Sequence, residues 1–496
     1  MSTPSTPSGS GTPRTSGTPR TSGAKRPPRP HRRPKKDPAR MVAFRALRAV
    51  DERDAYANLI LPSLLREAEQ KHNLDRRDAA LATELVYGTL RLQGTYDAVI
   101  AACIDRPLRE VDPPVLDVLS LGAHQLLTTR IPSHAAVSAT VELARAVLGD
   151  GKAKFVNAVL RRISAQDMAA WIAQVAPPYE KDAEDHLAVV HSHPRWVVSA
   201  LWDSLGRWQP DAAGRTAIEE LLTADNERPE VTLVARPGRA TAQELTEALP
   251  ESTPGRWSPY AVRLAEGGDP GGVEAVKENR VGVQDEGSQL VALALAAAPL
   301  EGADRLWLDG CAGPGGKAAL LAALAAQRGA ALVASEKQPH RAKLVARALD
   351  GNPGPYTVIA ADGLKPAWRP GSFDRVLVDV PCSGLGALRR RPEARWRRRP
   401  EDIAAFGPLQ RDLLRGAVAA TRIGGVVGYA TCSPHLAETR AVVDDVLREE
   451  GGRLEWIDAR PLLPGVPALG DGPDVQLWPH LHGTDAMYLA LLRRTA

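Results

Sequence analysis

The sequence predicts an α/β protein, with a doubly wound, mostly parallel sheet in its C-terminal part and an all-helical domain before it. Between residues 40 and 170, apolar residues recur at helical spacing and strand-like alternation is absent. From residue 281 to 496, short apolar runs alternate with helical stretches, as in βαβ units. Residues 171–280 mix both patterns, so we expect linker helices and a small α/β subdomain there.

Residues 1–39 form a segment of low complexity. The unit T-P-R-T-S-G begins at Thr12 and again at Thr18, and a run rich in lysine and arginine extends from Lys25 to Lys36. Almost nothing in this segment can be buried, so we expect a disordered basic tail. Two roles stay open for it: non-specific attraction to phosphates, or a solubilising leader with no specific role.

The helical domain is expected to be a bundle of amphipathic helices. Its apolar spacing predicts helices that include residues 77–92, 114–128, 134–148 and 154–163. In the region that follows, Thr241 and Glu244 match a capping box and predict the start of a short helix. This helix lies between two strand-like runs, at 231–235 and 261–264.

The C-terminal domain carries the strands of the predicted parallel sheet. The strand-like runs are 306–309, 331–335, 356–360, 375–380 and 425–430. Parallel strands end at one edge of their sheet, and ligands of such sheets bind beyond that edge. The residues that directly follow these strands are therefore the candidate site residues.

A glycine-rich turn follows the first of these strands and opens a helix. It consists of Cys311, Ala312, Gly313, Pro314, Gly315, Gly316 and Lys317. Glycines let the backbone turn sharply and approach a ligand, and the helix start offers unpaired N–H groups. The turn is not a phosphate-binding P-loop, because Ala318 follows the lysine where serine or threonine is required.

Acidic residues follow the next two strands. Glu336 ends the second strand and can accept hydrogen bonds from both hydroxyls of a ribose. Asp362 follows the third strand, where a carboxylate can accept from an adenine amino group. With the glycine-rich turn, these positions predict a site for an adenosine-type cofactor.

Two cysteines follow the fourth and fifth strands. Cys382 lies three residues after Asp379, in D-V-P-C-S-G, and Cys432 lies in T-C-S-P. Such groups suit methylation at carbon 5 of cytosine, a weak nucleophile until a thiolate adds to carbon 6 and makes the ring an enamine. A carboxyl group near ring nitrogen 3 stabilises the developing charge, a role that suits Asp379. The target base must leave its stack to reach such a site.

These motifs resemble those of the RNA 5-methylcytosine methyltransferases of the Sun/RsmB group. The resemblance rests on the stretch from Asp309 to Lys317, on Asp379–Gly384 and on Thr431–Ser433. It implies a Rossmann-like class I methyltransferase domain that uses S-adenosyl-L-methionine. It also implies that Cys432 is the nucleophile, whereas Cys382 assists product release.

In the family, the cofactor contacts the residues that match Cys311 to Lys317, Glu336, Asp362 and Asp379. The helical region resembles the NusB-like RNA-binding domain of RsmB proteins, for example in the stretch from Phe155 to Arg162. That domain implies small-subunit (16S) ribosomal RNA as the partner, either free or in a pre-assembly state.

The chain also departs from the family pattern at four places. After Ser433, Glu438 survives from an acidic motif whose asparagine is absent. Gly313 replaces an alanine, which loosens the turn, and Glu336 replaces the commoner aspartate, which shifts the carboxylate by one methylene. Near the C-terminus, Asp485 begins a stretch that differs from the family's glycine-aromatic run. None of these changes removes a catalytic group.

A run of arginines follows Cys382 closely. We expect Arg389, Arg390, Arg391 and Arg395 to hold RNA phosphates, and Trp396 to stack on a base. A solvated charged face is the alternative for such a run.

Composition bounds the remaining possibilities. The chain has 496 residues, a formal net charge of +4 and 4 cysteines, which never form a C-x-x-C pair. A metal site or a disulfide framework is therefore not expected, and free thiols suit the cytoplasm. No apolar stretch reaches membrane-spanning length, and no signal peptide is expected. Two alternative functions stay open: a tRNA cytosine methyltransferase, and a non-catalytic RNA-binding or ribosome assembly factor.

Overall fold

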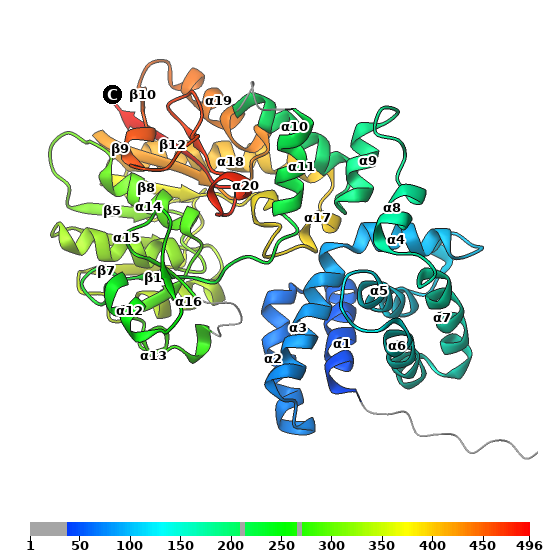
Figure 1. The fold of residues 1–496 in the computed structure, drawn as a ribbon. Coiled ribbons are helices and arrows are strands. Elements are labelled where there is room, and N and C mark those ends of the chain that lie inside the picture. The colour runs from blue at the N-terminus through cyan, green and yellow to red at the C-terminus, as the bar shows by residue number, and fades with distance from the viewer. Residues whose placement is uncertain (1–36, 209–213, 265–269) are drawn as a thin grey trace, which may run out of the picture. The chain divides into compact units, whose positions relative to one another are not determined.

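The computed structural model describes residues 37–208, 214–264 and 270–496 (Figure 1). Residues 1–36, which hold nearly all of the predicted basic tail, lie outside these ranges. The first helix, α1, begins at Pro38, where the side chain of Asp37 caps it by accepting from the Arg40 N–H at 3.0 Å. Within the described ranges, no helix combines the length and apolar character that a bilayer crossing requires.

The N-terminal region is helical, as the sequence predicts, and buries one core of its own. Its helices are α1 (Pro38–Arg53), α2 (Ala57–His72), α3 (Arg76–Arg91), α4 (Gln93–Ala102), α5 (Pro113–Leu127), α6 (Ser133–Leu148), α7 (Asp150–Ile163) and α8 (Met168–Val175). The apolar spacing did not reveal α4, because only Leu92 separates it from α3 and no side chain caps its start.

The next three helices contribute to the core of the C-terminal domain. They are α9 (Ala183–Val190), α10 (Arg195–Trp208) and α11 (Arg215–Ala224). Leu201 of α10 and Leu222 of α11 belong to the same buried cluster as Val376 and Tyr429 of the large sheet. The region expected to link two domains therefore also covers one face of that sheet.

A small antiparallel sheet follows, with strand order β2-β3-β1-β4. Its elements are β1 (Thr232–Ala235), α12 (Ala242–Ala248), β2 (Thr253–Pro254), β3 (Ala261–Arg263), α13 (Glu274–Lys277) and β4 (Val281–Val283). The capping box that the sequence predicts is present: Thr241 Oγ1 accepts from the Glu244 N–H at 3.1 Å, and Glu244 Oε2 accepts from the Thr241 N–H at 2.8 Å.

The large sheet has the order β10-β12-β9-β8-β5-β6-β7, and β11 pairs with β12. Strands β5 (Leu306–Asp309), β6 (Ala331–Ser335), β7 (Tyr356–Ile359), β8 (Phe373–Asp379) and β9 (Thr421–Thr431) are parallel. Strands β10 (Leu454–Ile457), β11 (Val475–Gln476) and β12 (Tyr488–Arg494) add an antiparallel edge. The sheet is therefore mixed and Rossmann-like.

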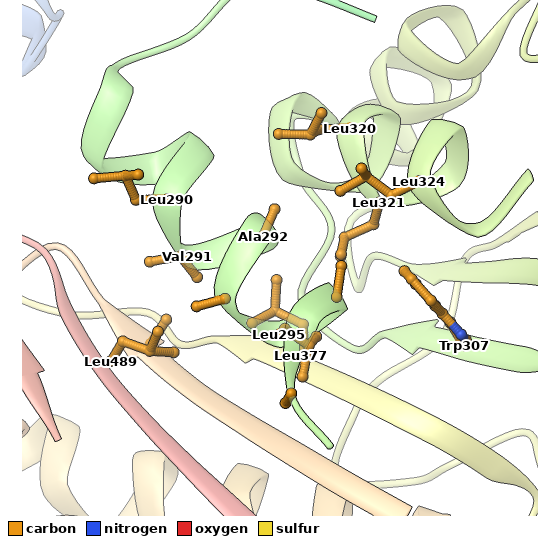
Figure 2. Packing of buried hydrophobic residues seen from close by; sticks show 14 of the residues in the cluster. Leu290, Val291, Ala292, Leu295, Trp307, Leu320, Leu321, Leu324, Leu377 and Leu489 are labelled. Carbon is orange, nitrogen blue, oxygen red and sulfur yellow. The ribbon is translucent and has the colours of Figure 1, made fainter. Parts of the chain in front are cut away.

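Helices cover both faces of this sheet. One face carries α14 (Glu286–Ala297), α15 (Gly316–Gln327) and α16 (Pro339–Leu349); the other carries α18 (Pro400–Ala420) and α19 (Arg440–Glu450). Along β8 the side chains alternate, because Leu377 joins the first cluster whereas Val376 and Val378 join the second. Figure 2 shows Leu295 of α14 close to Leu377 of β8, with the leucines of α15 beside them. Burial of each such leucine stabilises the fold by about 1.5–3 kcal/mol. This packing holds in place the strand ends that carry the candidate site residues.

Candidate active site

The strand order reverses between β5 and β8, and the polar residues gather at the carboxyl ends of these two neighbouring strands. Lys317, one residue into α15, donates to Asp379 Oδ2 at 2.8 Å and to Ser288 Oγ at 3.1 Å. Burial opposes the charged ammonium, but the Asp379 carboxylate outweighs it and raises the pKa of Lys317. An ion pair therefore links the glycine-rich turn to the strand that precedes Cys382.

The glycine-rich turn is held too tightly for larger residues at two positions. A Cβ at Gly313 would lie 2.0 Å from Glu336 Oε2, and a Cβ at Gly315 would lie 2.6 Å from the Cβ of Ala348. Gly315 also has φ +116°, in the region that favours glycine. The Gly313 carbonyl accepts from Arg341 at 2.7 Å. Glycine in place of alanine at residue 313 is thus matched to the longer side chain of Glu336.

The predicted cofactor acids lie at the ends of β6 and β7. Glu336 is buried and accepts from the Gln338 N–H at 2.9 Å, and its other oxygen lies 3.5 Å from Arg341. Asp362 pairs with Lys337 at 3.0 Å and accepts from the Leu364 N–H at 3.1 Å. Glu336 is thus placed beside the glycine-rich turn. Asp362 lies at the next strand end along the same edge of the sheet.

The charges of this edge suit some ligands better than others. Four carboxylates follow or end its strands: Asp309, Glu336, Asp362 and Asp379. Burial, together with the Asp379 charge, raises the pKa of Asp309 to about 7. An edge this rich in acids disfavours a polyphosphate and fits a ligand that carries hydroxyl groups and positive charge.

The two cysteines of the predicted site meet. The Sγ atoms of Cys382 and Cys432 lie 3.4 Å apart, and both residues are free thiols that are partly exposed. The contact with Cys432 and then burial raise the pKa of Cys382 well above its ordinary value. Cys382 is therefore held as a neutral thiol that can donate a hydrogen bond.

A buried carboxylate, which the sequence reasoning did not assign to the site, ties the two cysteine loops together. Glu438 is fully buried, and its oxygens accept from the Ser383 N–H at 2.8 Å, from Ser383 Oγ at 2.5 Å and from Ser433 Oγ at 2.6 Å. Gln410 of α18 donates to the same carboxylate at 3.2 Å. Because each serine directly follows a cysteine, Glu438 fixes the spacing of the two sulfur atoms. The acidic residue after T-C-S was the only sequence signal for this role.

A second residue that the sequence reasoning missed is Gly386. Its N–H donates to the Cys432 carbonyl at 2.9 Å, and its carbonyl accepts from the Ala486 N–H at 2.8 Å. A Cβ at this position would lie 2.2 Å from the Ala486 carbonyl oxygen. Only glycine allows the backbone after Cys382 to pass so close to the Cys432 loop.

Two of the arginines expected to hold RNA form ion pairs with carboxylates of the same chain. Arg390 donates to Asp285 at 2.8 Å and to Asp485 at 3.1 Å, and the buried Arg389 lies 3.3 Å from Asp485. This ion-pair network gives a physical reason for the departure at Asp485: the carboxylate compensates the guanidinium groups of Arg389 and Arg390. The RNA-contact expectation is corrected for Arg389, which is buried and paired, whereas Arg390 is partly exposed and its RNA contact stays a prediction.

The same correction applies to Arg395. This side chain is 0% exposed and donates to the Ser192 carbonyl at 2.9 Å and to Asn226 Oδ1 at 2.8 Å, so it is not free to contact RNA. The ring of Trp396 packs against Gly94, where a Cβ would lie 2.3 Å from it, but Trp396 is partly exposed. Arg391 is exposed. The expectation of an RNA contact therefore stays a prediction for Arg390, Arg391 and Trp396.

The large sheet is Rossmann-like, with a glycine-rich turn after its first parallel strand and acids after the next two. A pair of thiols lies at the same edge. Together these features define a methyltransferase domain, preceded here by a helical domain. Comparison with known proteins agrees. The family model described as 16S rRNA methyltransferase RsmB/F matches residues 294–493, and the NusB family model matches residues 37–165. The chain belongs to the RsmB/F family, also called the Sun family.

Relatives match along most of the chain. A Mycobacterium tuberculosis protein named as a methyltransferase is 54% identical over 466 residues, which cover 94% of this chain and 98% of that protein. The ribosomal RNA small subunit methyltransferase B of Pseudomonas putida is 32% identical, with coverage of 84% and 90%.

Solved structures share the fold. The crystal structure of PH0851 has a TM-score of 0.74 at 20% identity and covers 93% of this chain and 99% of its own. The structure of NSun6 from Pyrococcus horikoshii with SFG has a TM-score of 0.50 at 16% identity, with coverage of 60% and 98%.

Proposed function

We propose that the chain uses S-adenosylmethionine to methylate carbon 5 of a cytosine in small-subunit ribosomal RNA, with Cys432 as the covalent nucleophile. The observation that carries the proposal is the 3.4 Å contact between the sulfur atoms of Cys382 and Cys432, at the sheet edge that also holds the Lys317–Asp379 ion pair. Two thiols with separate roles are what this reaction needs.

The residues of the sheet edge fit S-adenosylmethionine. The glycine-rich turn, Glu336 and Asp362 would hold it, because the acids can accept from ribose and adenine groups and favour a positively charged ligand. When bound, S-adenosylmethionine supplies a methyl group on a positively charged sulfur. A Cβ at Gly313 would clash with Glu336 Oε2, so glycine is what allows this turn and the carboxylate to lie so close together.

The chain's own residues account for the activation of the base. Cys432 Sγ, as a thiolate, adds to carbon 6 of the flipped cytosine, and the displaced electron pair makes carbon 5 nucleophilic. Asp379 lies at the end of the neighbouring strand, where its carboxyl group, in the protonated form, can donate a hydrogen bond to ring nitrogen 3 as negative charge develops there. Burial lowers the pKa of Lys317, but Asp379 and, to a smaller extent, the charge of Cys432 raise it, so this ammonium group provides positive charge near the attacking sulfur.

The second thiol then completes the cycle. After carbon 5 carries the methyl group, its proton is removed by a base and the bond from carbon 6 to Cys432 breaks, which releases the thiolate. Cys382, held as a neutral thiol by its neighbour and by burial, can donate a hydrogen bond to the departing Cys432 thiolate as the product leaves. The assignment of Cys432 as nucleophile and Cys382 as release group follows the family resemblance.

The substrate assignment depends on the helical domain and on the relatives. Residues 37–165 match the NusB family, and the Pseudomonas putida relative is named for the small ribosomal subunit. Transfer RNA is the alternative substrate for the same chemistry. A non-catalytic assembly factor is disfavoured, because such a protein has no need of two paired thiols beside a cofactor-type turn.

The direct test is methylation of purified RNA by the purified full-length chain. Protein-free 16S rRNA and bulk tRNA are incubated with S-adenosylmethionine, and 5-methylcytosine is mapped by bisulfite sequencing. We expect one new site in 16S rRNA, none in tRNA, and none with Cys432→Ala. The matched control is Cys103→Ala, because Cys103 lies in the helical core and should leave activity intact. Methylation of tRNA alone, or of another atom, would overturn the proposal.

A further inference from the structure

A cavity of about 320 Å³ lies between helices α1, α3, α4 and α5 and the short helix α17 (Ala394–Arg397) of the C-terminal domain. Five carboxylates contribute to its lining: Asp51, Asp54, Asp97, Asp117 and Glu393. The wall also contains leucine side chains and Trp396, together with Val50, Pro113, the polar side chains of Thr89, Gln93 and Ser120, and Arg397. We call this cavity the acidic pocket.

The carboxylates of the acidic pocket are not fully compensated. Asp51 and Asp117 share Arg48, at 2.8 and 2.7 Å. Within the described ranges, Asp97 has no hydrogen-bond or ion-pair partner. Burial and the neighbouring Asp117 raise the pKa of Asp97 to about 7, which reflects the cost of an unpaired charge there.

Two deeply buried polar side chains that line the pocket also lack partners. Glu393 is 2% exposed; one oxygen accepts from the Ala57 N–H at 2.9 Å, whereas Oε2 has no hydrogen bond. Thr89, also 2% exposed, has an unpaired Oγ1. Glu393 Oε2 and Thr89 Oγ1 are therefore available to accept hydrogen bonds from a ligand that supplies donors.

The cation nearest at hand does not satisfy these groups. Arg397 lines the pocket, but its guanidinium donates to the backbone carbonyls of Val50, Asp54 and Ala55, at 2.6–2.8 Å. Its N–H donors are therefore occupied by the backbone around the turn between α1 and α2. A ligand must bring its own positive charge to pair with Asp97 and Glu393.

The chemistry of the wall selects the class of ligand. We propose that the acidic pocket binds a small organic cation of the diamine or polyamine class. Ammonium groups pair with Asp97 and Glu393, the methylene spacer packs on Leu47, Leu90 and Leu116, and Trp396 offers an aromatic face to a cation. A metal ion fits less well, because the described residues contain no group of three or more His, Cys, Asp or Glu that could hold one.

The position of the pocket gives such binding a consequence. Glu393, Trp396 and Arg397 belong to the segment that follows Cys382, and Arg398 donates to the Ser383 carbonyl at 3.1 Å. A bound cation would therefore stabilise the contact of this segment with the helical domain, next to the cysteine loop. The proposal concerns binding alone and does not depend on the identity of the methylated base.

The test measures binding to the RNA-free, full-length chain. Putrescine and spermidine are titrated by calorimetry and by thermal unfolding at pH 8, with NaCl and MgCl₂ at matched ionic strength as comparisons. We expect saturable binding and a rise in Tm. Asp97→Asn and Glu393→Gln should each weaken binding at least 10-fold, about 1.4 kcal/mol. Glu110→Gln, an exposed change in the same domain, should not.

The unliganded variants separate lost binding from misfolding. Asp97→Asn removes an unpaired buried charge, so its Tm without ligand should equal or exceed that of the parent chain at pH 8. The proposal is wrong if neither amine binds, if the variants bind as well as the parent, or if matched salts give the same rise in Tm.

Discussion

The carboxylate of Glu438 gives a sharp test of how the cysteine loops are held. Its four hydrogen bonds come from the Ser383 N–H, the Ser383 and Ser433 hydroxyls and the Gln410 amide. Glu438→Gln preserves the size of the side chain but removes the charge and turns one acceptor into a donor. Hydrogen bonds to a charged group contribute about 1.5–3 kcal/mol each and the serine hydroxyls can rotate, so we expect a loss of about 2–4 kcal/mol in unfolding free energy.

The loss of activity should exceed what lower stability explains. Ser383 and Ser433 directly follow the two cysteines, so a shift of either loop changes the 3.4 Å separation of the sulfur atoms. A misplacement of about 1 Å at a reacting group costs roughly 10²-fold in rate. Single-turnover methyl transfer well below the new Tm should therefore fall by about 10²-fold, whereas the affinity for S-adenosylmethionine should stay unchanged.

The matched control is Glu455→Gln, an exposed change on β10 that should alter neither quantity. Urea denaturation gives the free energy of unfolding, calorimetry gives the cofactor affinity, and rapid quench gives the rate of transfer. If Glu438→Gln retains both the stability and the single-turnover rate of the parent chain, the proposed role of Glu438 in spacing the cysteines is wrong.

Three further predictions concern the cofactor turn, a buried acid and the arginine run. Gly313→Ala should weaken S-adenosylmethionine binding at least 10-fold in calorimetry because its Cβ would meet Glu336, whereas Gly151→Ala, outside the cofactor turn and with nothing within 4 Å of its Cβ, should not; equal affinities would refute this. The pKa of Asp309 is about 7, above its unfolded value, so its contribution to stability falls as pH rises from 4 to 7. Asp309→Asn should remove that fall. In urea titrations the variant should be more stable than the parent by about 2–4 kcal/mol at pH 8 but not at pH 4. If the unfolding free energies of variant and parent change with pH in parallel, the raised pKa of Asp309 is contradicted. Arg395→Ala should lower the unfolding free energy by about 2–4 kcal/mol because it leaves buried acceptors unpaired. Arg391→Ala should leave Tm unchanged and weaken RNA binding in filter assays. If instead Arg395→Ala weakens RNA binding without loss of stability and Arg391→Ala lowers Tm, the original RNA assignment of Arg395 is restored.

Local patterns predicted most of the parallel sheet, because its strands are short, largely apolar runs with a polar residue at or shortly after their ends. The runs at 306–309 and 331–335 coincide with β5 and β6. The antiparallel edge was not predicted. Tyr488–Arg494 becomes β12 by pairing with β9, Tyr488 opposite Thr431, and a pairing between such distant segments leaves no local signal.

The site was predictable where a single motif carries the chemistry. The strand ends placed Cys382 and Cys432 at one edge of the sheet, but neither motif predicts the distance between their sulfur atoms. The roles of Glu438 and Gly386 depend on contacts between the two loops, which only the fold brings together.

The arginine run shows the opposite case. Its sequence suggests a phosphate-binding surface, yet Arg390 pairs with Asp285 and Asp485, which are 105 and 95 residues away. A charge run does not indicate whether distant carboxylates neutralise it. The acidic residue at 485, which departs from the family pattern, was the signal available for this pairing.

The covalent role of Cys432 is tested most directly by trapping the protein–RNA adduct. The Cys382→Ala chain is incubated with 16S rRNA and S-adenosylmethionine, and the product is separated under denaturing conditions and digested for mass spectrometry. We predict an adduct that joins methylated cytosine to residue 432, and none with Cys432→Ala. An adduct that persists in Cys432→Ala, or one attached to Cys382 in the parent chain, would contradict the mechanism.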